Sequence, residues 1–174
     1  IAVRIYPVGK KIADELHKAG YQTDNSFLQA GDKLNYEDAS QLATAMMTLY
    51  TSGQADRVEL FYHHFKNMAE QILTEKVFLP ITLPEITSIS MSANYILEPS
   101  SEHLLALLLP KVLHLHIYTT LLDNTTAEHA ARMLAMQTAN DNANDLIQEL
   151  TLQYNKNRQQ AITNELLDIM GGAG

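Results

Sequence analysis

Every second residue from Ile1 to Ile5 is a branched aliphatic residue, and the residues between them are smaller or polar. This period of two predicts a strand over 1–6. The apolar residues of the segment 10–19 instead recur at helical spacing and stop before Gly20, which predicts a helix. A strand, a turn and a helix in this order form half of a parallel α/β unit.

The next patterns extend this domain along the chain. The segment 21–29 is predicted to form a strand, and the segment 35–53 a helix whose apolar residues lie on one face. The segments 56–67 and 70–81 read strongly as strands and are separated by only two residues, which predicts an antiparallel hairpin at a sheet edge. Residues 1–81 are therefore expected to form an α/β domain.

A connector and a long helix are expected after this domain. Residues 82–100 contain two prolines and many serines and threonines, so we expect a connector that is most mobile at 82–94. The helix is expected to cover 101–170, with a kink at Pro110. A capping-box sequence that starts at Thr125 leaves a break near that residue as an alternative to one continuous helix.

The predicted helix is too long to pack inside a compact domain. The segment 111–170 has neither glycine nor proline and spans roughly 90 Å as a helix, whereas a domain of this chain length is about 40 Å across. We therefore expect the helix to project. From about residue 128 its apolar residues follow the spacing of a coiled-coil seam, in which alanines allow a partner helix to approach closely. The seam residues are Met136, Ala139, Ala143, Leu146, Leu150, Tyr154, Ala161 and Leu166.

Composition limits the classes of partner and chemistry. A net charge of −8 and a pI near 5.2 argue against a nucleic-acid surface, and the absence of cysteine excludes disulfides and thiol chemistry. No window of 18 apolar residues is present, and the nearest approach, Leu104–Leu122, is predicted to be a buried helix. Because the chain begins with Ile1 rather than methionine, we expect that residues precede it.

Three features that suggest chemistry have simpler structural interpretations. His114 and His116 are two residues apart on a predicted helix, so they do not share the face that metal ligands require. The sequence YPVGKK follows a predicted strand but lacks the first glycine and the hydroxyl residue of a phosphate loop. Asp141 and Asp145 lie on an open helix face, which is not the enclosed setting of a pair of catalytic acids. We expect no catalytic, cofactor-binding or metal-binding residue.

The C-terminal segment resembles a known family. The pieces that carry the resemblance are HAARM at 129–133, DNA at 141–143, LIQELTLQYNKNRQ at 146–159, ITNEL at 162–166 and GG at 171–172. Together they resemble the C-terminal helix of the gamma subunit of the rotary ATP synthase. Earlier pieces, VGKK, ELFYHHFKN, FLPI and YILEPSSEHLLALLLPKVL, agree in order and spacing with the same family, although its N-terminal helix and first strand have no counterpart here.

The resemblance implies a fold and a function. It implies an α/β fold, with an incomplete three-layer Rossmann-like sheet domain followed by a long projecting C-terminal coiled-coil helix. It further implies a non-catalytic central-stalk subunit, located peripherally on the cytoplasmic face of the bacterial inner membrane, which transmits torque from the membrane rotor ring to the catalytic head. The implied partners are the alpha, beta and epsilon subunits, the rotor ring and the family's N-terminal helix. An isolated fragment is expected either to fray beyond about Glu128 or to form a homodimer through its seam, and the homodimer is favoured because Ala139 and Ala143 allow close approach.

The resemblance also implies which residues touch the ring of catalytic subunits. They are Arg132, Arg158, Gln159, Thr163 and Glu165. Half of the 28 residues in the segment 137–164 are Asn, Gln or Thr, which fits either a solvated face or a surface that meets other protein without forming ion pairs. Two alternative functions come from other classes: a small doubly wound enzyme that binds a nucleotide near Gly9, and a coiled-coil scaffold.

Overall fold

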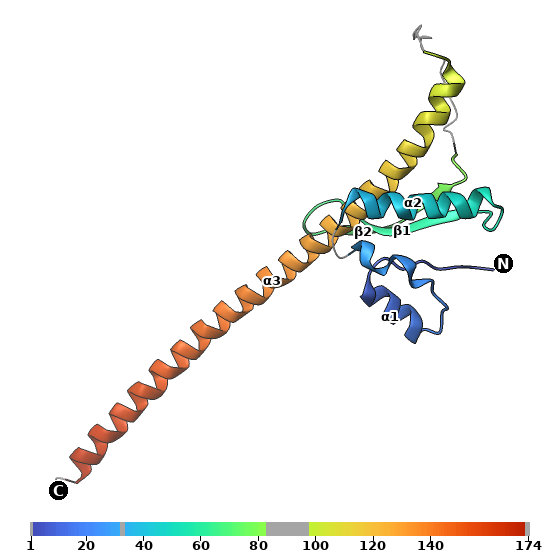
Figure 1. Cartoon of the computed structure of the whole chain (residues 1–174). Helices are drawn as coiled ribbons and strands as arrows, with labels where there is room; N and C mark the ends of the chain where they lie inside the picture. Colours follow the sequence, from blue (N-terminus) through green and yellow to red (C-terminus); the bar gives the residue numbers. More distant parts are fainter. Residues whose placement is uncertain (1, 32–33, 83–97, 173–174) are drawn as a thin grey trace. The chain divides into compact units, whose positions relative to one another are not determined.

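The computed structural model describes residues 2–31, 34–82 and 98–172. They fall into two compact units, Ile1–His129 and Ala130–Gly174, which are considered separately. The helices and strands, labelled in Figure 1, are α1 (Lys10–Lys18), η1 (Asn25–Gly31, a 3₁₀ helix), α2 (Tyr36–Thr51), β1 (Val58–Phe65), β2 (Gln71–Leu79) and α3 (Ser101–Gly171).

Local chemistry sets where the first two α-helices begin. Gly9 precedes α1 with a φ of 110°, a conformation that residues with a Cβ atom rarely adopt. At the start of α2 the Asn35 side chain accepts a hydrogen bond from the backbone N–H of Asp38 at 2.8 Å, which satisfies a donor that the helix leaves unpaired. Both predicted helices are confirmed.

Strands β1 and β2 form the predicted antiparallel hairpin. Their pairing runs from Val58 opposite Leu79 to Phe65 opposite Gln71. The loop is longer than the two residues predicted, since β1 ends at Phe65 and β2 begins at Gln71. Within the loop, the side chain of Asn67 accepts hydrogen bonds from the backbone N–H groups of Ala69 and Glu70, which stabilise the turn.

Two of the predicted strands are wrong. Within 2–6 only Ile5 has a strand-like partner, in an isolated parallel bridge to Thr23. Most of the segment 21–29 belongs instead to η1, whose start is stabilised by hydrogen bonds that the Asp24 carboxylate accepts from the backbone N–H and hydroxyl of Ser26. Such local side-chain bonds compete with strand pairing. Among the described residues the sheet is therefore the β1–β2 hairpin.

The core of the first unit joins α2, β2 and α3. Its buried residues are Ala39, Leu42, Ala43, Met46, Phe78, Leu79, Leu113 and Ile117. Figure 1 shows α2 lying along the hairpin, which agrees with this cluster. The predicted class, α/β with a long C-terminal helix, is confirmed, although the sheet of the described residues is smaller than the predicted Rossmann-like one.

Helix α3 is continuous over 71 residues. The Ser100 hydroxyl accepts a hydrogen bond from the backbone N–H of His103 at 3.2 Å and thereby caps the start of the helix. Pro110 lies inside the helix. The alternative of a break near Thr125 is excluded, because the Thr125 hydroxyl donates to the carbonyl of Leu121 at 2.8 Å, a bond typical of threonine within a helix.

The apolar segment at the start of α3 is not the buried helix that was predicted. Leu113 and Ile117 are buried, but Leu105, Val112 and Leu115 are each at least half exposed. One window of 18 residues in α3 has a mean hydropathy of 1.5, and 17% of that window is buried, so by length and composition it could cross a membrane. The expectation that no segment could span a membrane rested on the absence of 18 consecutive apolar residues, whereas a high mean hydropathy does not require an unbroken apolar run.

The connector predicted for 82–100 lies mostly outside the described residues, and so does its predicted mobility at 82–94. The predicted domain boundaries at 81 and 100 stay predictions. The boundary between compact units falls within α3, after His129.

Candidate functional site

Within the first unit, α3 contacts α2, β1 and β2 through histidine, aspartate and asparagine side chains, which together form the α3 junction. The first contact is with α2, where His114 lies between two hydroxyl groups. Its Nδ1 is 3.2 Å from the Ser40 hydroxyl, and its Nε2 is 3.1 Å from the Thr44 hydroxyl.

The hydrogen bonds around His114 select one arrangement of protons. The Thr44 hydroxyl donates to the carbonyl of Ser40 at 2.8 Å, so its oxygen is left to accept from Nε2 of His114. Nδ1 is then the acceptor for the Ser40 hydroxyl. The three groups form a closed ring of hydrogen bonds that ties α3 to α2.

The second contact is between α3 and β2. The His116 ring lies against Phe78, with 5.8 Å between the ring centroids. Its Nε2 is buried without a hydrogen-bond partner. Burial, followed by the positive charge of Lys76, lowers the pKa of His116, so the neutral imidazole is favoured.

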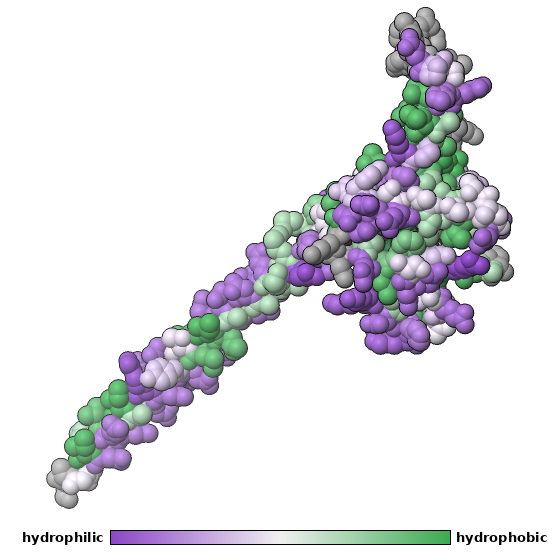
Figure 2. Space-filling view, viewed as in Figure 1, coloured by the Kyte–Doolittle hydropathy of each residue, from purple (hydrophilic) through white to green (hydrophobic). Residues whose placement is uncertain are grey.

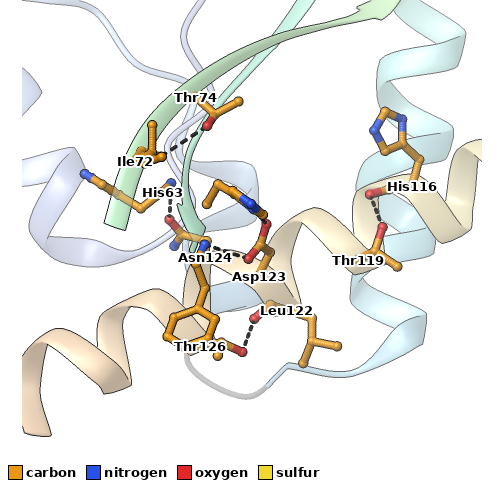
Figure 3. Close-up of polar contacts among 11 residues, drawn as sticks. His63, Ile72, Thr74, His116, Thr119, Leu122, Asp123, Asn124 and Thr126 are labelled. Carbon is orange, nitrogen blue, oxygen red and sulfur yellow. Dashed lines mark hydrogen bonds and ion pairs between the residues drawn. The ribbon is translucent and has the colours of Figure 1, made fainter. Parts of the chain in front are cut away.

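The third contact is between α3 and β1, where two consecutive side chains of the helix meet the strand (Figure 3). The backbone N–H of Phe65 donates to Asp123 at 2.9 Å, and that of His63 donates to Asn124 at 3.0 Å. The second carboxylate oxygen of Asp123 lies 2.6 Å from Nδ1 of His64. Burial raises the pKa of Asp123, but hydrogen bonds from His64 and Phe65 outweigh it, and the net shift is downward.

The predicted seam and ring-contact residues lie in the second unit, in the C-terminal part of α3, and all of them are exposed. At about 100° per residue, seven of the eight seam residues fall within an arc of roughly 80°, and Leu166 lies outside it. Figure 2 shows apolar patches among hydrophilic side chains along this part of the helix.

The five predicted ring-contact residues do not share one face. Gln159 and Thr163 lie opposite the seam, and the Thr163 hydroxyl donates to the carbonyl of Gln159 at 2.8 Å. Arg158 and Glu165 flank the seam, and Arg132 lies on the seam side. The helix therefore brings these residues together in pairs, and a partner that covers the seam leaves Gln159 and Thr163 accessible.

The described residues give no support to a metal site or to a nucleotide site near Gly9. Among the described residues no group of three or more His, Asp or Glu side chains could hold a metal ion. Gly9 does precede a helix, but among the described residues before it, 2–8, only Ile5 takes part in strand pairing.

Sequence reasoning missed the α3 junction. A usable signal was present in the sequence, because a stripe at helical spacing runs through Leu113, Ile117, Thr120 and Ala127 and includes the polar residue Asn124. In the structure the first four of these residues are buried. A polar residue inside an apolar stripe indicates a specific hydrogen-bond partner.

An α/β unit whose last helix continues for some forty further residues with exposed side chains belongs to the class of proteins that present a helical rod to partners. A family model described as ATP synthase matches residues 1–174, and the chain belongs to that family. The chain is 65% identical over 173 residues to the ATP synthase gamma chain of Parabacteroides distasonis, and it is 48% identical over 183 residues to that of Bacteroides thetaiotaomicron.

These matches cover 99% and 98% of this chain, but only 60% and 61% of the two relatives. The chain thus spans about three-fifths of the length of the curated relatives it matches. A cryo-EM structure of the central stalk and c-ring of the Tetrahymena thermophila mitochondrial ATP synthase has a TM-score of 0.52. At 22% identity, over 78% of this chain and 59% of that one, this likeness concerns the fold.

Proposed function

We propose that this chain forms part of the central rotor subunit of a proton-translocating ATP synthase and transmits torque between the membrane rotor and the catalytic head. The observation that carries the proposal is α3, because every described residue after Ala130 lies in or directly after one continuous helix and is exposed. The relatives named ATP synthase gamma chain support it.

The physical reason is that a single helix gains little stability from intrinsic propensity and most from packing an apolar face. Exposed Met136, Leu146, Leu150 and Tyr154 therefore require a partner. In the proposed subunit that partner is a helix of the same polypeptide, such as the family's N-terminal helix. The subunit itself is non-catalytic, and chemistry takes place on its partners.

The ring of catalytic alpha and beta subunits is the proposed partner of the remaining faces. Gln159 and Thr163 are the strongest candidates, since they lie opposite the seam. Arg158 and Glu165 would contact the ring beside the paired helices. Arg132 lies within the seam arc, so its long side chain would have to reach past the partner helix to contact the ring. The epsilon subunit and the membrane rotor ring are the other proposed partners, which gives a peripheral location on the cytoplasmic face of the bacterial membrane.

Co-purification tests the proposal. A tagged chain with the full length of the curated relatives should recover alpha, beta and epsilon subunits from the native host and should restore ATP-driven proton pumping to a strain that lacks its own subunit. The same chain ended at residue 130 is the matched control and should not restore pumping. Recovery of the tagged chain without catalytic subunits would show that it is a scaffold or a free enzyme.

A further inference from the structure

The hairpin is attached to the rest of its unit at two separate points. At one end Phe78 and Leu79 of β2 are buried in the core, and Val58 pairs with Leu79. At the other end His63 and Phe65 of β1 meet α3. The two points are about 20 Å apart along β1, at roughly 3.3 Å per residue.

The second attachment depends on the direction in which the backbone N–H groups of β1 point. His63 and Phe65 are two residues apart, so their backbone N–H groups point the same way, away from β2. Such groups at a strand edge normally bind another strand or water. Here side chains of α3 occupy both positions, because Asn124 accepts from His63 and Asp123 accepts from Phe65 (Figure 3).

This arrangement disfavours a shift of β1 by one residue. An ionised carboxylate only accepts hydrogen bonds. If β1 shifted by one residue, the N–H groups of Tyr62 and His64, which point toward β2, would replace the donors that Asp123 and Asn124 require. The His64 imidazole adds a further contact of 2.6 Å to Asp123.

We propose that Asp123 and Asn124 are positioning residues that clamp the far end of the hairpin to α3, so that the hairpin and the helix move as one body. A hairpin held only by its core end could pivot about that end, and load applied to it would be lost as local motion. The consequence for torque rests on the proposed function, whereas the clamp itself does not.

Other polar contacts near this point are local, and they supply matched controls. The Thr126 hydroxyl donates to the carbonyl of Leu122 at 2.8 Å, and that of Thr119 donates to the carbonyl of His116 at 3.0 Å. Both bonds stay within α3. Three further ion pairs, Lys18–Glu15, Arg57–Glu59 and Lys66–Glu70, join residues two to four positions apart.

Amide hydrogen exchange of the chain tests the clamp directly. Asp123→Ala should accelerate exchange at Phe65, and Asn124→Ala at His63, by roughly tenfold to a hundredfold, which corresponds to the loss of a hydrogen bond to a charged or polar partner. Asp123→Asn keeps an acceptor and should restore most of the protection at Phe65. Thr126→Ala should leave both amides unchanged. Unaltered exchange at both amides in the alanine variants would overturn the proposal.

The same variants in the assembled ATP synthase test the consequence. Asp123→Ala should assemble and hydrolyse ATP but pump fewer protons per ATP than the parent, Asp123→Asn should recover coupling, and Thr126→Ala should match the parent. Normal coupling in an Asp123→Ala complex whose hairpin amides exchange fast would overturn the mechanical role. Failure of the parent chain itself to assemble would instead refute the proposed function and leave the exchange result standing.

Discussion

Replacing Ile117 with alanine tests whether α3 is part of the core or only lies beside it. Ile117 is 2% exposed and belongs to the cluster that joins α2, β2 and α3. The substitution removes three carbons, which is about 2.4 kcal/mol at roughly 0.8 kcal/mol per buried carbon. The cavity left behind raises the expected loss in the free energy of unfolding to about 3 kcal/mol.

Leu115 provides the matched control, because it lies two residues away on the same helix and is 52% exposed. Leu115→Ala also removes three carbons, but about half of the side chain is already in water, so the expected loss is about 1 kcal/mol. The difference of about 2 kcal/mol corresponds to a roughly thirtyfold difference in the unfolding equilibrium.

Urea titration followed by tyrosine fluorescence, together with amide exchange in β1 and β2, measures this difference. The chain has eight tyrosines and no tryptophan, and the edge-to-face pair of Tyr36 and Tyr118 reports directly on contact between α2 and α3. Exchange of the hairpin amides should accelerate about thirtyfold more in Ile117→Ala than in Leu115→Ala. Equal losses in the two variants would show that α3 does not complete the core.

Three further predictions concern titration and the exposed helix. Because the pKa of His116 is lowered, the unfolded state binds more protons than the folded state below about pH 6.5. The parent should therefore lose stability as the pH falls through that value, and His116→Phe should lose less. Urea midpoints at two pH values measure both losses, and equal losses in the parent and the variant would refute the role of His116. The isolated chain should be a dimer by light scattering and Ala143→Glu a monomer of reduced helicity, whereas a monomeric parent with a fully protected helix would refute the seam. Arg158→Glu and Glu165→Lys in the assembled complex should alter coupling with little loss of stability, since exposed ion pairs contribute only about 0–1 kcal/mol; unchanged hydrolysis and coupling in both would remove them from the contact surface.

Elements whose signals are local were predictable. The caps at Asn35 and Ser100 and the hairpin all follow from residues within a few positions of one another. The strand over 1–6 was not predictable, because alternation shows only that a strand is compatible with the sequence. A strand also needs a neighbour, and among the described residues only Ile5 finds one.

The candidate site was likewise predictable only where its signal is local in the sequence. Periodicity predicts the seam, which stays a prediction, but it could not say which of two apolar faces of α3 is buried in the first unit. Leu113 and Ile117 lie on the buried face, while Leu105, Val112 and Leu115 lie on the exposed one, and both faces are equally apolar. The contacts of Asp123 and Asn124 join residues about sixty positions apart, so no local pattern could identify their partners.

The spacing of the seam determines how a second helix would follow it. From Met136 to Tyr154 the seam advances 18 residues in five steps, which is about 3.6 residues per step, the repeat of an undistorted α-helix. A left-handed superhelix requires about 3.5. A helix that pairs with this face would therefore wind only gradually around α3, as in a coiled coil of long pitch. In the proposed rotor subunit, such a gently wound pair would stay narrow along its whole length, and a shaft that turns inside a close-fitting sleeve requires a narrow profile.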